Sequence, residues 1–311
     1  MRKENPIEGR RCVIYGAGGG GRAFLALNRQ NIRAVAFADR SEGLQRSRID
    51  GLEVVAPNDI GALEYDYVVI ASMWVGEIRS TLHELGIGDE RIVVPPKNQL
   101  KNGLPFQDAS TKNLAEDSVV AITDFLYHAG VTAFVDFGTL LGLAREGGIL
   151  QWDDDVDMSV NASEFEAARA CWEEVRSHLP DARGARWTST WIHDCGGRSL
   201  GISLDLTDID ESPFNAFGIY VRCRHIEGPW SIPTGAIGNV EIPSKHFSSA
   251  EVLPVFGRRV FAPFEYEGYL SLVYGDWNSP RPALSFDDYP RFDQRSYAGV
   301  DANSISRSPI F

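Results

Sequence analysis

The segment Val135-Asp-Phe-Gly-Thr-Leu-Leu-Gly-Leu-Ala-Arg-Glu-Gly-Gly-Ile-Leu-Gln-Trp-Asp-Asp-Asp-Val-Asp-Met158 decides the fold of the second half of the chain. It continues a predicted strand, residues 132–136, through a Gly-Thr turn into a short helical stretch that reaches Arg145. It then returns as a second predicted strand over residues 153–160, in which apolar and polar residues alternate. Alternation of this kind indicates a strand with one buried face.

Carboxylates crowd the second of these strands. Side chains two residues apart share a face of a strand, so Asp155 and Asp157 are expected to point one way and Asp154 the other. Like charges on one face repel unless a cation lies between them. Mg²⁺ prefers carboxylate oxygens together with substrate phosphates. We therefore expect Asp155 and Asp157 to bind Mg²⁺ or Mn²⁺, with Asp154 nearby to contact substrate. The apolar Val156 and Met158 disfavour a solvated acidic loop.

The turn between the two strands is a candidate phosphate site. Gly138 and Thr139 lie at the start of the helical stretch, where backbone N–H groups can point at a bound anion. We expect these two residues to hold a phosphate of the substrate. Arg145, at the far end of the stretch, has two open interpretations. It is either a planar fork that clamps a phosphate or an ordinary cation at a helix C-terminus.

A third carboxylate is predicted on a separate strand, within residues 201–210. Leu204 and Leu206 share one face of that strand, so Asp205 lies on the other face, and Asp208 falls on the leucine side. Asp205 is therefore the better candidate for a third metal ligand, or for the base that accepts a proton from a hydroxyl. An exposed strand carboxylate without such a role remains the alternative.

Several motifs occur in the order of a known family. They are Gly138-Thr-Leu-Leu-Gly142, Arg145-Glu-Gly-Gly148, Trp152-Asp-Asp-Asp-Val-Asp157 and, later, Val260-Phe-Ala-Pro263, Tyr269-Leu270 and Tyr274-Gly-Asp-Trp277. In these motifs the chain resembles the LicD/fukutin family, a branch of the nucleotidyltransferase fold, over roughly residues 115–282. The chain departs from the family's pattern at Phe137, where glycine is usual, and matches it only loosely around Asp205.

The resemblance implies a function. LicD-type enzymes transfer a phospho-alcohol, of the phosphocholine, ribitol phosphate or glycerol phosphate type, from a CDP-linked donor to a hydroxyl of a glycan or glycolipid, and they release CMP. This implies a role in capsule, lipopolysaccharide or teichoic acid synthesis, with Asp155, Asp157 and Asp205 at a magnesium site. Two alternatives remain open. One is a nucleotidyltransferase acting on a small molecule, and the other is a nucleotide-sugar sensor with an inactive transferase site.

A glycine-rich loop characterises the first part of the chain. The segment Gly16-Ala-Gly18-Gly-Gly-Gly21 fits the pattern G-x-G-x-x-G, follows an apolar strand and opens a helix, and Asp39 ends the next strand. Such glycines let a pyrophosphate approach the helix N-terminus, and an acidic residue in that place bonds ribose hydroxyls. The alternative is that the glycines only permit tight packing of strand and helix.

This first part is similar to the short Rossmann-like domains of bacterial surface-glycan enzymes, which implies a nucleotide or nucleotide sugar as its ligand. It spans only about 95 residues, shorter than a full six-stranded dinucleotide domain. The second part shows no obvious hydride-transfer partner. An NAD-dependent dehydrogenase is therefore disfavoured.

The order of predicted elements sets the domain organisation. Strands and helices alternate up to about residue 94, which predicts a small doubly wound parallel sheet. We expect an α/β and α+β chain: a Rossmann-like domain at residues 1–96, a Pro- and Asn-containing linker at residues 97–112, and a nucleotidyltransferase-fold domain with a mixed sheet at residues 113–311.

Two local features complete the expected second domain. The pattern Ser163-x-x-Glu166 predicts a capping box at the start of a helix. The tail beyond Pro280 is predicted to be irregular, because it shows no sustained periodicity.

The composition excludes other classes of protein. The 311 residues include 43 acidic and 30 basic residues, a formal net charge of −13, so the basic surface of a general nucleic-acid binder is not expected. We predict neither a transmembrane segment nor a signal peptide. Four scattered cysteines indicate a reducing, cytoplasmic location. A structural zinc site from His193, Cys195, Cys223 and His225 is disfavoured, because their spacing fits no known short zinc motif.

Overall fold

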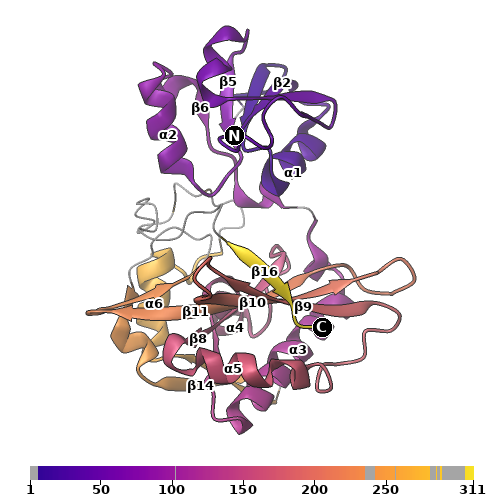
Figure 1. Cartoon of the computed structure of the whole chain (residues 1–311), viewed down its shortest axis with the longest axis vertical. Coiled ribbons are helices and arrows are strands. Elements are labelled where there is room, and N and C mark those ends of the chain that lie inside the picture. The colour runs from indigo at the N-terminus through magenta and orange to yellow at the C-terminus, as the bar shows by residue number, and fades with distance from the viewer. Residues whose placement is uncertain are drawn as a thin grey trace. The chain divides into compact units, whose positions relative to one another are not determined.

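The computed structural model describes residues 6–101, 103–234, 242–255, 257–280, 285, 288 and 305–311 (Figure 1). The chain divides into two compact units. The first unit contains residues 6–101, 285 and 288, and the second contains the described residues between 103 and 280 together with residues 305–311. Within these ranges, no helix combines the length and the apolar character needed to cross a membrane.

The first unit is built around one sheet. Its elements are β1 (Arg11–Tyr15), α1 (Gly19–Asn28), β2 (Arg33–Ala38), β3 (Arg48–Ile49), β4 (Leu52–Val55), the 3₁₀ helix η1 (Pro57–Ala62), β5 (Tyr67–Ile70), α2 (Val75–Glu84), the 3₁₀ helix η2 (Asp89–Arg91), β6 (Ile92–Val93) and the 3₁₀ helix η3 (Lys97–Leu100).

This sheet is doubly wound. Its strand order is β3-β4-β2-β1-β5-β6, and every pair except β3–β4 is parallel. Strands of a parallel sheet are buried on both faces. Ile14 of β1 accordingly packs in a cluster with Phe24 of α1, while Val13 packs in a second cluster with Leu82 of α2. The predicted Rossmann-like fold of this part is confirmed.

The second unit contains more strands and a longer first helix. Its elements are η4 (Pro105–Gln107), α3 (Ala109–His128), β7 (Phe134–Val135), α4 (Phe137–Glu146), β8 (Asp155–Asn161), α5 (Ala162–Val175), β9 (Arg186–His193), β10 (Ser199–Thr207), β11 (Gly218–Glu227), β12 (Trp230–Pro233), β13 (Ile242–Pro243), η5 (Ser244–Phe247), β14 (Ala250–Val255), β15 (Arg258–Pro263), α6 (Tyr266–Tyr274) and β16 (Ser306–Pro309).

The sheet of the second unit is mixed, as predicted. Its strands follow the order β14-β15-β7-β8-β11-β10-β9-β16. The pairs β15–β7 and β8–β11 are parallel, and the other pairs in this order are antiparallel. The parallel pair β8–β11 brings the acidic strand to the middle of the sheet. Strands β12 and β13 extend the sheet beside β11.

The two faces of this sheet differ in chemistry. Helices α3 and α5 contact each other and cover one face, on which Val156, Met158 and Val160 of β8 are completely buried. On that face, the indole N–H of Trp172 in α5 donates to the Ser189 hydroxyl. Helices α4 and α6 contact each other and cover the opposite face, which carries the carboxylates of β8. One face of the sheet therefore packs in an apolar core, and the other face carries polar and charged side chains.

The predicted linker is partly structured. Helix α3 begins at Ala109, within the predicted linker, because the Asp108 side chain caps it by accepting the Thr111 N–H at 2.7 Å. Phe106 is completely buried, and its ring lies 5.4 Å from that of Phe217. Residues 105–112 are therefore part of the packed second unit, and this segment of the predicted linker is wrong.

Two local predictions are also wrong. Helix α5 follows Asn161 with no side-chain cap, so Ser163 and Glu166 do not form a capping box. The Glu166 carboxylate instead accepts a hydrogen bond from the Ser199 hydroxyl at 2.5 Å. The tail that was expected to be irregular contains Ser306–Pro309, which pairs with β9 as strand β16. An unpaired strand edge offers backbone groups to any segment that can extend along it, whatever its hydropathy.

Candidate active site

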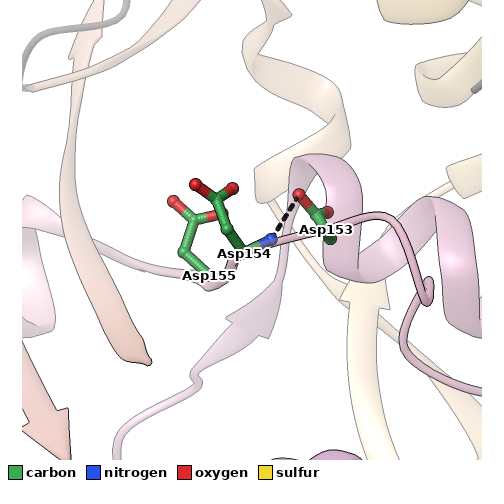
Figure 2. A group of neighbouring side chains, drawn as sticks. All are labelled: Asp153, Asp154 and Asp155. Atoms are coloured by element: carbon green, nitrogen blue, oxygen red, sulfur yellow. Dashed lines mark hydrogen bonds between the residues drawn. The ribbon is translucent and has the colours of Figure 1, made fainter. Parts of the chain in front are cut away.

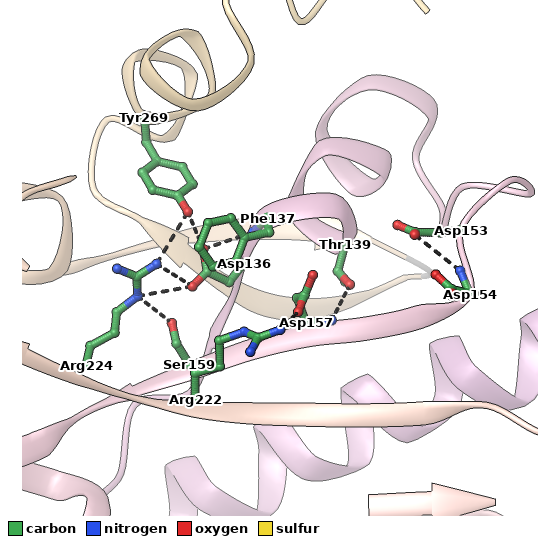
Figure 3. Close-up of polar contacts among 10 residues, drawn as sticks. All are labelled: Asp136, Phe137, Thr139, Asp153, Asp154, Asp157, Ser159, Arg222, Arg224 and Tyr269. Carbon is green, nitrogen blue, oxygen red and sulfur yellow. Dashed lines mark hydrogen bonds and ion pairs between the residues drawn. The ribbon is translucent and has the colours of Figure 1, made fainter. Parts of the chain in front are cut away.

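A buried ion pair holds the start of α4 (Figure 3). Asp136 caps the helix by accepting the Phe137 N–H at 2.9 Å. Its other oxygen accepts from Arg224, with Nη2 at 2.6 Å and Nε at 3.1 Å, and both side chains are fully buried. Tyr269 of α6 donates its hydroxyl to Asp136, and Arg224 also donates to Ser159. One carboxylate thus connects α4, β8, β11 and α6.

The residue after this carboxylate has an unusual backbone. Phe137 has a φ of +40°, a region that L residues rarely adopt. Its buried ring packs 6.4 Å from the ring of Tyr269 and 5.5 Å from the Arg224 guanidinium. Glycine, the usual residue of the family pattern here, adopts positive φ without strain. Packing of the phenyl ring therefore offsets the backbone cost at this position.

In most helix positions an alanine variant is more stable than a glycine variant, and we expect the opposite at position 137. Both Phe137→Ala and Phe137→Gly lose the ring, but only alanine keeps the strain of the positive φ. A left-handed residue costs about 1–2 kcal/mol. Urea unfolding should therefore show Phe137→Gly to be about 1 kcal/mol more stable than Phe137→Ala. Greater stability of the alanine variant would contradict the strain.

Three consecutive carboxylates gather at the start of β8 (Figure 2). Asp153, Asp154 and Asp155 each place a carboxylate oxygen within 4.8 Å of the other two. The backbone N–H of Asp154 donates to Asp153 at 3.2 Å. Because β8 begins at Asp155, strand alternation does not orient the two preceding side chains. The prediction that Asp154 points away from Asp155 is therefore wrong.

Helix α4 closely approaches the segment Asp153–Asp155, which we call the acidic turn. A Cβ atom on Gly138 would lie 2.4 Å from Oδ2 of Asp153, so a larger residue would displace that carboxylate. Thr139 is only 2% exposed, and its hydroxyl accepts the backbone N–H of Asp157 at 2.8 Å. Of the predicted phosphate-binding pair, Gly138 lies beside the carboxylates. Thr139 fastens the helix to β8.

Asp157 lies beside a cation of the protein. Its Oδ1 is 2.8 Å from Nη2 of Arg222 on β11, and both side chains are largely buried. Burial raises the pKa of Asp157, and the charge of Arg222 acts against this shift. The Nε of Arg222 is also buried and has no hydrogen-bond partner among the described residues. The predicted metal ligand is therefore already neutralised in part by Arg222.

Asp205 lies on the same face as Asp155, two strands away. The register aligns Asp155 with Gly218 of β11, and Gly218 with Asp205 of β10. A Cβ atom on Gly218 would lie 2.9 Å from Oδ1 of Asp205 and 3.2 Å from the Tyr220 hydroxyl. The absent side chain thus leaves room for Asp205 between the two strands. We call the sheet face that carries Asp155, Asp157 and Asp205 the acidic face.

The acidic face perturbs the groups that lie on it. Burial raises the pKa of Asp205, opposed by a hydrogen bond from the Ser203 side chain. Burial, reinforced by the charges of Asp205 and Asp155, raises the pKa of Tyr220 to about 12. A carboxylate with a raised pKa is a better proton acceptor than an ordinary one, and perturbed groups of this kind are typical of functional sites.

Two other candidates lie apart from this arrangement. Asp208 follows β10 in a loop and forms an exposed ion pair with Arg186 at 2.9 Å. Arg145 donates to the Trp277 carbonyl at 3.1 Å and pairs with Glu146 at 3.0 Å. These contacts fasten the end of α4 to the segment after α6. They fit the interpretation of Arg145 as a helix-terminal cation.

The histidines and cysteines do not form one cluster. His193 Nε2 lies 3.0 Å from the Ser308 hydroxyl, whereas Cys223 Sγ lies 3.5 Å from His225 Nε2. Burial raises the pKa of Cys223 to about 12, which keeps it as a thiol. Cys195 is exposed. In the described ranges, the acidic turn is the only group of three or more potential metal ligands.

The glycine-rich loop of the first unit contains two kinds of glycine. Gly16 has a φ of +111°, and a Cβ atom on Gly21 would lie 1.8 Å from the Gly16 carbonyl oxygen. Gly18 has a φ of −78° and nothing within 4 Å of its Cβ position. Asp39 braces the loop by accepting the Ala17 N–H at 2.8 Å. Packing therefore explains Gly16 and Gly21, but it does not explain Gly18.

This difference predicts opposite results for two alanine variants. Gly21→Ala forces a backbone clash and should lower the free energy of unfolding of the first unit by about 3 kcal/mol. Gly18→Ala meets open space at an ordinary φ and should change it by less than about 0.5 kcal/mol. Chemical denaturation of both variants checks the pair. Equal losses would contradict the geometry of the loop.

The mixed sheet, with carboxylates at the start of β8 beside the N-terminus of α4, fits the nucleotidyltransferase fold that the resemblance implied. Residues 130–264 match the LicD/FKTN/FKRP nucleotidyltransferase domain, and residues 8–93 match the domain described as C2185-like, N-terminal. The predicted resemblance is therefore confirmed: a LicD-type domain follows a C2185-like domain. In general terms, this family implies phospho-alcohol transfer in surface-glycan synthesis. None of the curated proteins matches the chain significantly.

Two of the solved structures that match the chain overlap with it only weakly. UDP-D-quinovosamine 4-dehydrogenase from Vibrio fischeri is 21% identical over 28% of this chain and 79% of that chain, with a TM-score of 0.25. A putative myo-inositol dehydrogenase from Sinorhizobium meliloti is 14% identical over 89% of this chain and 92% of that chain, with a TM-score of 0.21. At these scores the overlaps carry no argument about the chain.

The cations of the acidic face, Arg222 and Arg224, were not predicted from the sequence. Tyr220, Arg222 and Arg224 alternate with apolar residues along β11, which was a signal that they share one face. Their partners Asp157 and Asp136 lie 65 and 88 residues away in the sequence. No local pattern connects residues so far apart.

Proposed function

We propose that the second unit transfers a phospho-alcohol, of the phosphocholine, ribitol phosphate or glycerol phosphate type, from a CDP-linked donor to a hydroxyl of a glycan or glycolipid. The reaction uses Mg²⁺ or Mn²⁺ and serves cell-surface polysaccharide synthesis. The observation that carries the proposal is the acidic turn Asp153–Asp155 beside α4, with Asp205 on the same face.

The residues present fit a divalent cation. Three carboxylates approach one another within 4.8 Å at the start of β8, and clustered carboxylate oxygens are the ligands that Mg²⁺ prefers. Asp155 would hold the ion, with Asp153 and Asp154 beside it and Asp205 facing it across Gly218. When bound, the cation supplies neutralisation of the donor diphosphate and of the charge that develops during phosphoryl transfer.

Asp205 has the environment of a general base. Burial raises the pKa of its carboxyl group, which suits it to accept the proton of the acceptor hydroxyl. The acceptor oxygen then forms a bond to the distal phosphorus of the donor. The bond between that phosphorus and the bridging oxygen breaks, and CMP leaves with the electron pair. Phosphoryl transfer of this kind depends on positioning and electrostatics rather than on a covalent intermediate.

The test is a panel of donors. CDP-choline, CDP-ribitol and CDP-glycerol are each added with Mg²⁺ or with EDTA, and melting temperature and products are measured. A donor at 100 times its dissociation constant should stabilise the folded protein by about 2.7 kcal/mol. Metal-dependent release of CMP supports the proposal. Release of pyrophosphate from a nucleoside triphosphate would instead support a nucleotidyltransferase, and binding without turnover would support a sensor.

We further infer that the first unit binds a nucleotide or nucleotide sugar through Gly16, Gly18, Gly21 and Asp39. The support is Gly18, where open space remains above the start of α1. A phosphate placed there would meet the backbone N–H groups of the helix N-terminus. The test compares UDP-sugar affinity of the wild type and Gly18→Val by calorimetry. Unchanged affinity would contradict this inference.

A further inference from the structure

The C-terminal strand brings a cation to the acidic face. Strand β16 lies outside residues 130–264, which match the LicD-type domain, and its sequence predicted no structure. It pairs antiparallel with β9, and Arg307 lies opposite Ile192. Backbone hydrogen bonds between Ser189 and both Ile310 and Phe311 extend the pairing beyond the strand. The fold therefore fixes the position of Arg307.

The register places Arg307 on the same side of the sheet as Asp205. Ile192 of β9 lies opposite Gly201 of β10, and directly opposed residues share a face. Gly201 and Asp205 are four residues apart on one strand, so they also share a face. Arg307 therefore belongs to the acidic face, although it lies at the edge of the sheet.

The charge of Arg307 reaches the groups of the site. It lowers the pKa of Asp205 against the larger effect of burial, and it acts in the same direction on Tyr220. The residue is exposed, and within the described ranges its guanidinium forms no hydrogen bond or ion pair. Arg222 and Arg224, in contrast, are bound to Asp157 and Asp136. Unlike Arg222 and Arg224, Arg307 therefore remains available to a ligand on this face.

We propose that Arg307 is a substrate-binding residue that donates hydrogen bonds to the oxygens of the phosphate being transferred. The proposal rests on the proposed function. If Asp205 takes the proton of the acceptor hydroxyl, the phosphorus under attack must lie next to Asp205, on the face of the sheet that also carries Arg307. Arginine presents a planar fork that matches two phosphate oxygens, and charge-assisted hydrogen bonds of this kind are strong.

The test measures nucleotide affinity by calorimetry with Mg²⁺ present. The probes are CDP and CMP, which differ only in the distal phosphate. Arg307→Gln should weaken CDP binding about tenfold and CMP binding by less than about twofold, as expected for one charge-assisted hydrogen-bonding group. Arg307→Lys should give an intermediate loss, because lysine keeps the charge but not the fork. Unchanged CDP affinity, or equal losses for CDP and CMP, would overturn the proposal.

Arg258→Gln is the matched control. Arg258 is an exposed arginine of β15, near the opposite edge of the same sheet, so its loss changes the net charge equally. Its CDP affinity should equal that of the wild type, and an equal loss in this variant would overturn a specific role for Arg307. Melting temperatures of all variants should agree within about 2 °C, since both side chains are exposed.

Pyrophosphate as a third probe separates this proposal from the proposed function. If the wild type binds pyrophosphate without any preference for cytidine nucleotides, the CDP-linked donor is wrong. A loss of pyrophosphate affinity in Arg307→Gln alone would still support the role of Arg307. If Arg307→Gln binds pyrophosphate as tightly as the wild type, and the wild type binds CDP, the proposed role of Arg307 is wrong. The proposed function is then unaffected.

Discussion

Asp155→Asn is expected to reduce turnover by about a thousandfold while the second unit stays folded. Asp155 lies at the centre of the acidic turn and faces Asp205 across Gly218. Removal of its charge would weaken binding of the divalent cation, whose charge stabilises the transition state by several kcal/mol. Each 1.36 kcal/mol of lost stabilisation lowers the rate about tenfold. The measurement is CMP release with a cognate CDP-linked donor, beside Mn²⁺ affinity measured by calorimetry.

Asp208→Asn is the control for this variant. It removes the same charge from an exposed ion pair in a loop, so turnover and Mn²⁺ affinity should stay within about twofold of the wild type. The melting temperature of Asp155→Asn is measured beside turnover, to show that the second unit stays folded. If Asp155→Asn kept wild-type turnover and Mn²⁺ affinity, the acidic turn would not be the metal site.

Asp136→Asn is expected to destabilise the second unit by about 3–5 kcal/mol, because it leaves the charge of Arg224 buried without its counter-ion. Both side chains of this pair are completely buried. For a unit of this size the loss corresponds to a fall in melting temperature of about 10 °C. Calorimetric or denaturant unfolding of the full chain measures it, with the transition of the first unit as an internal reference.

Lys245→Ala is the matched control for the buried pair. Lys245 and Glu265 also form an ion pair in this unit, but both side chains are about half exposed. Exposed pairs contribute about 1 kcal/mol or less, so this variant should melt close to the wild type. If Asp136→Asn were as mild as Lys245→Ala, the buried network would not stabilise the fold. If Asp136→Asn shows the expected loss, the double variant Asp136→Asn with Arg224→Leu should recover part of it, because it removes the orphaned charge.

The faces of the strands were predictable from the sequence, because the period of two along a strand is local information. The alternation in β8 and β10 was enough to place Asp155 and Asp205 on polar faces, and the structure puts them on the same face. The glycine loop of the first unit was predictable for the same reason. Strand, glycines, helix and acidic residue follow one another within a short stretch.

The remaining features depend on contacts that no local pattern encodes. Asp154 joined the acidic turn because β8 begins one residue after it, and strand ends are set by the partner strands. Strand β16 formed because β9 offered an open edge, not because its own residues favour a strand. The capping box failed because Ser199, from another strand, provides the hydrogen bond to Glu166.

The Asp136 network also constrains the order in which the chain can fold. Arg224 and Tyr269 follow Asp136 by 88 and 133 residues, so neither is present when α4 leaves the ribosome. Contacts between such distant residues form slowly, because a long loop must close before they can stabilise anything. The sheet of the first unit, in contrast, is complete at Val93. We expect the first unit to fold during synthesis. The carboxylate of Asp136 in the second unit should stay without its counter-ion until Arg224 has been synthesised and the second unit folds cooperatively.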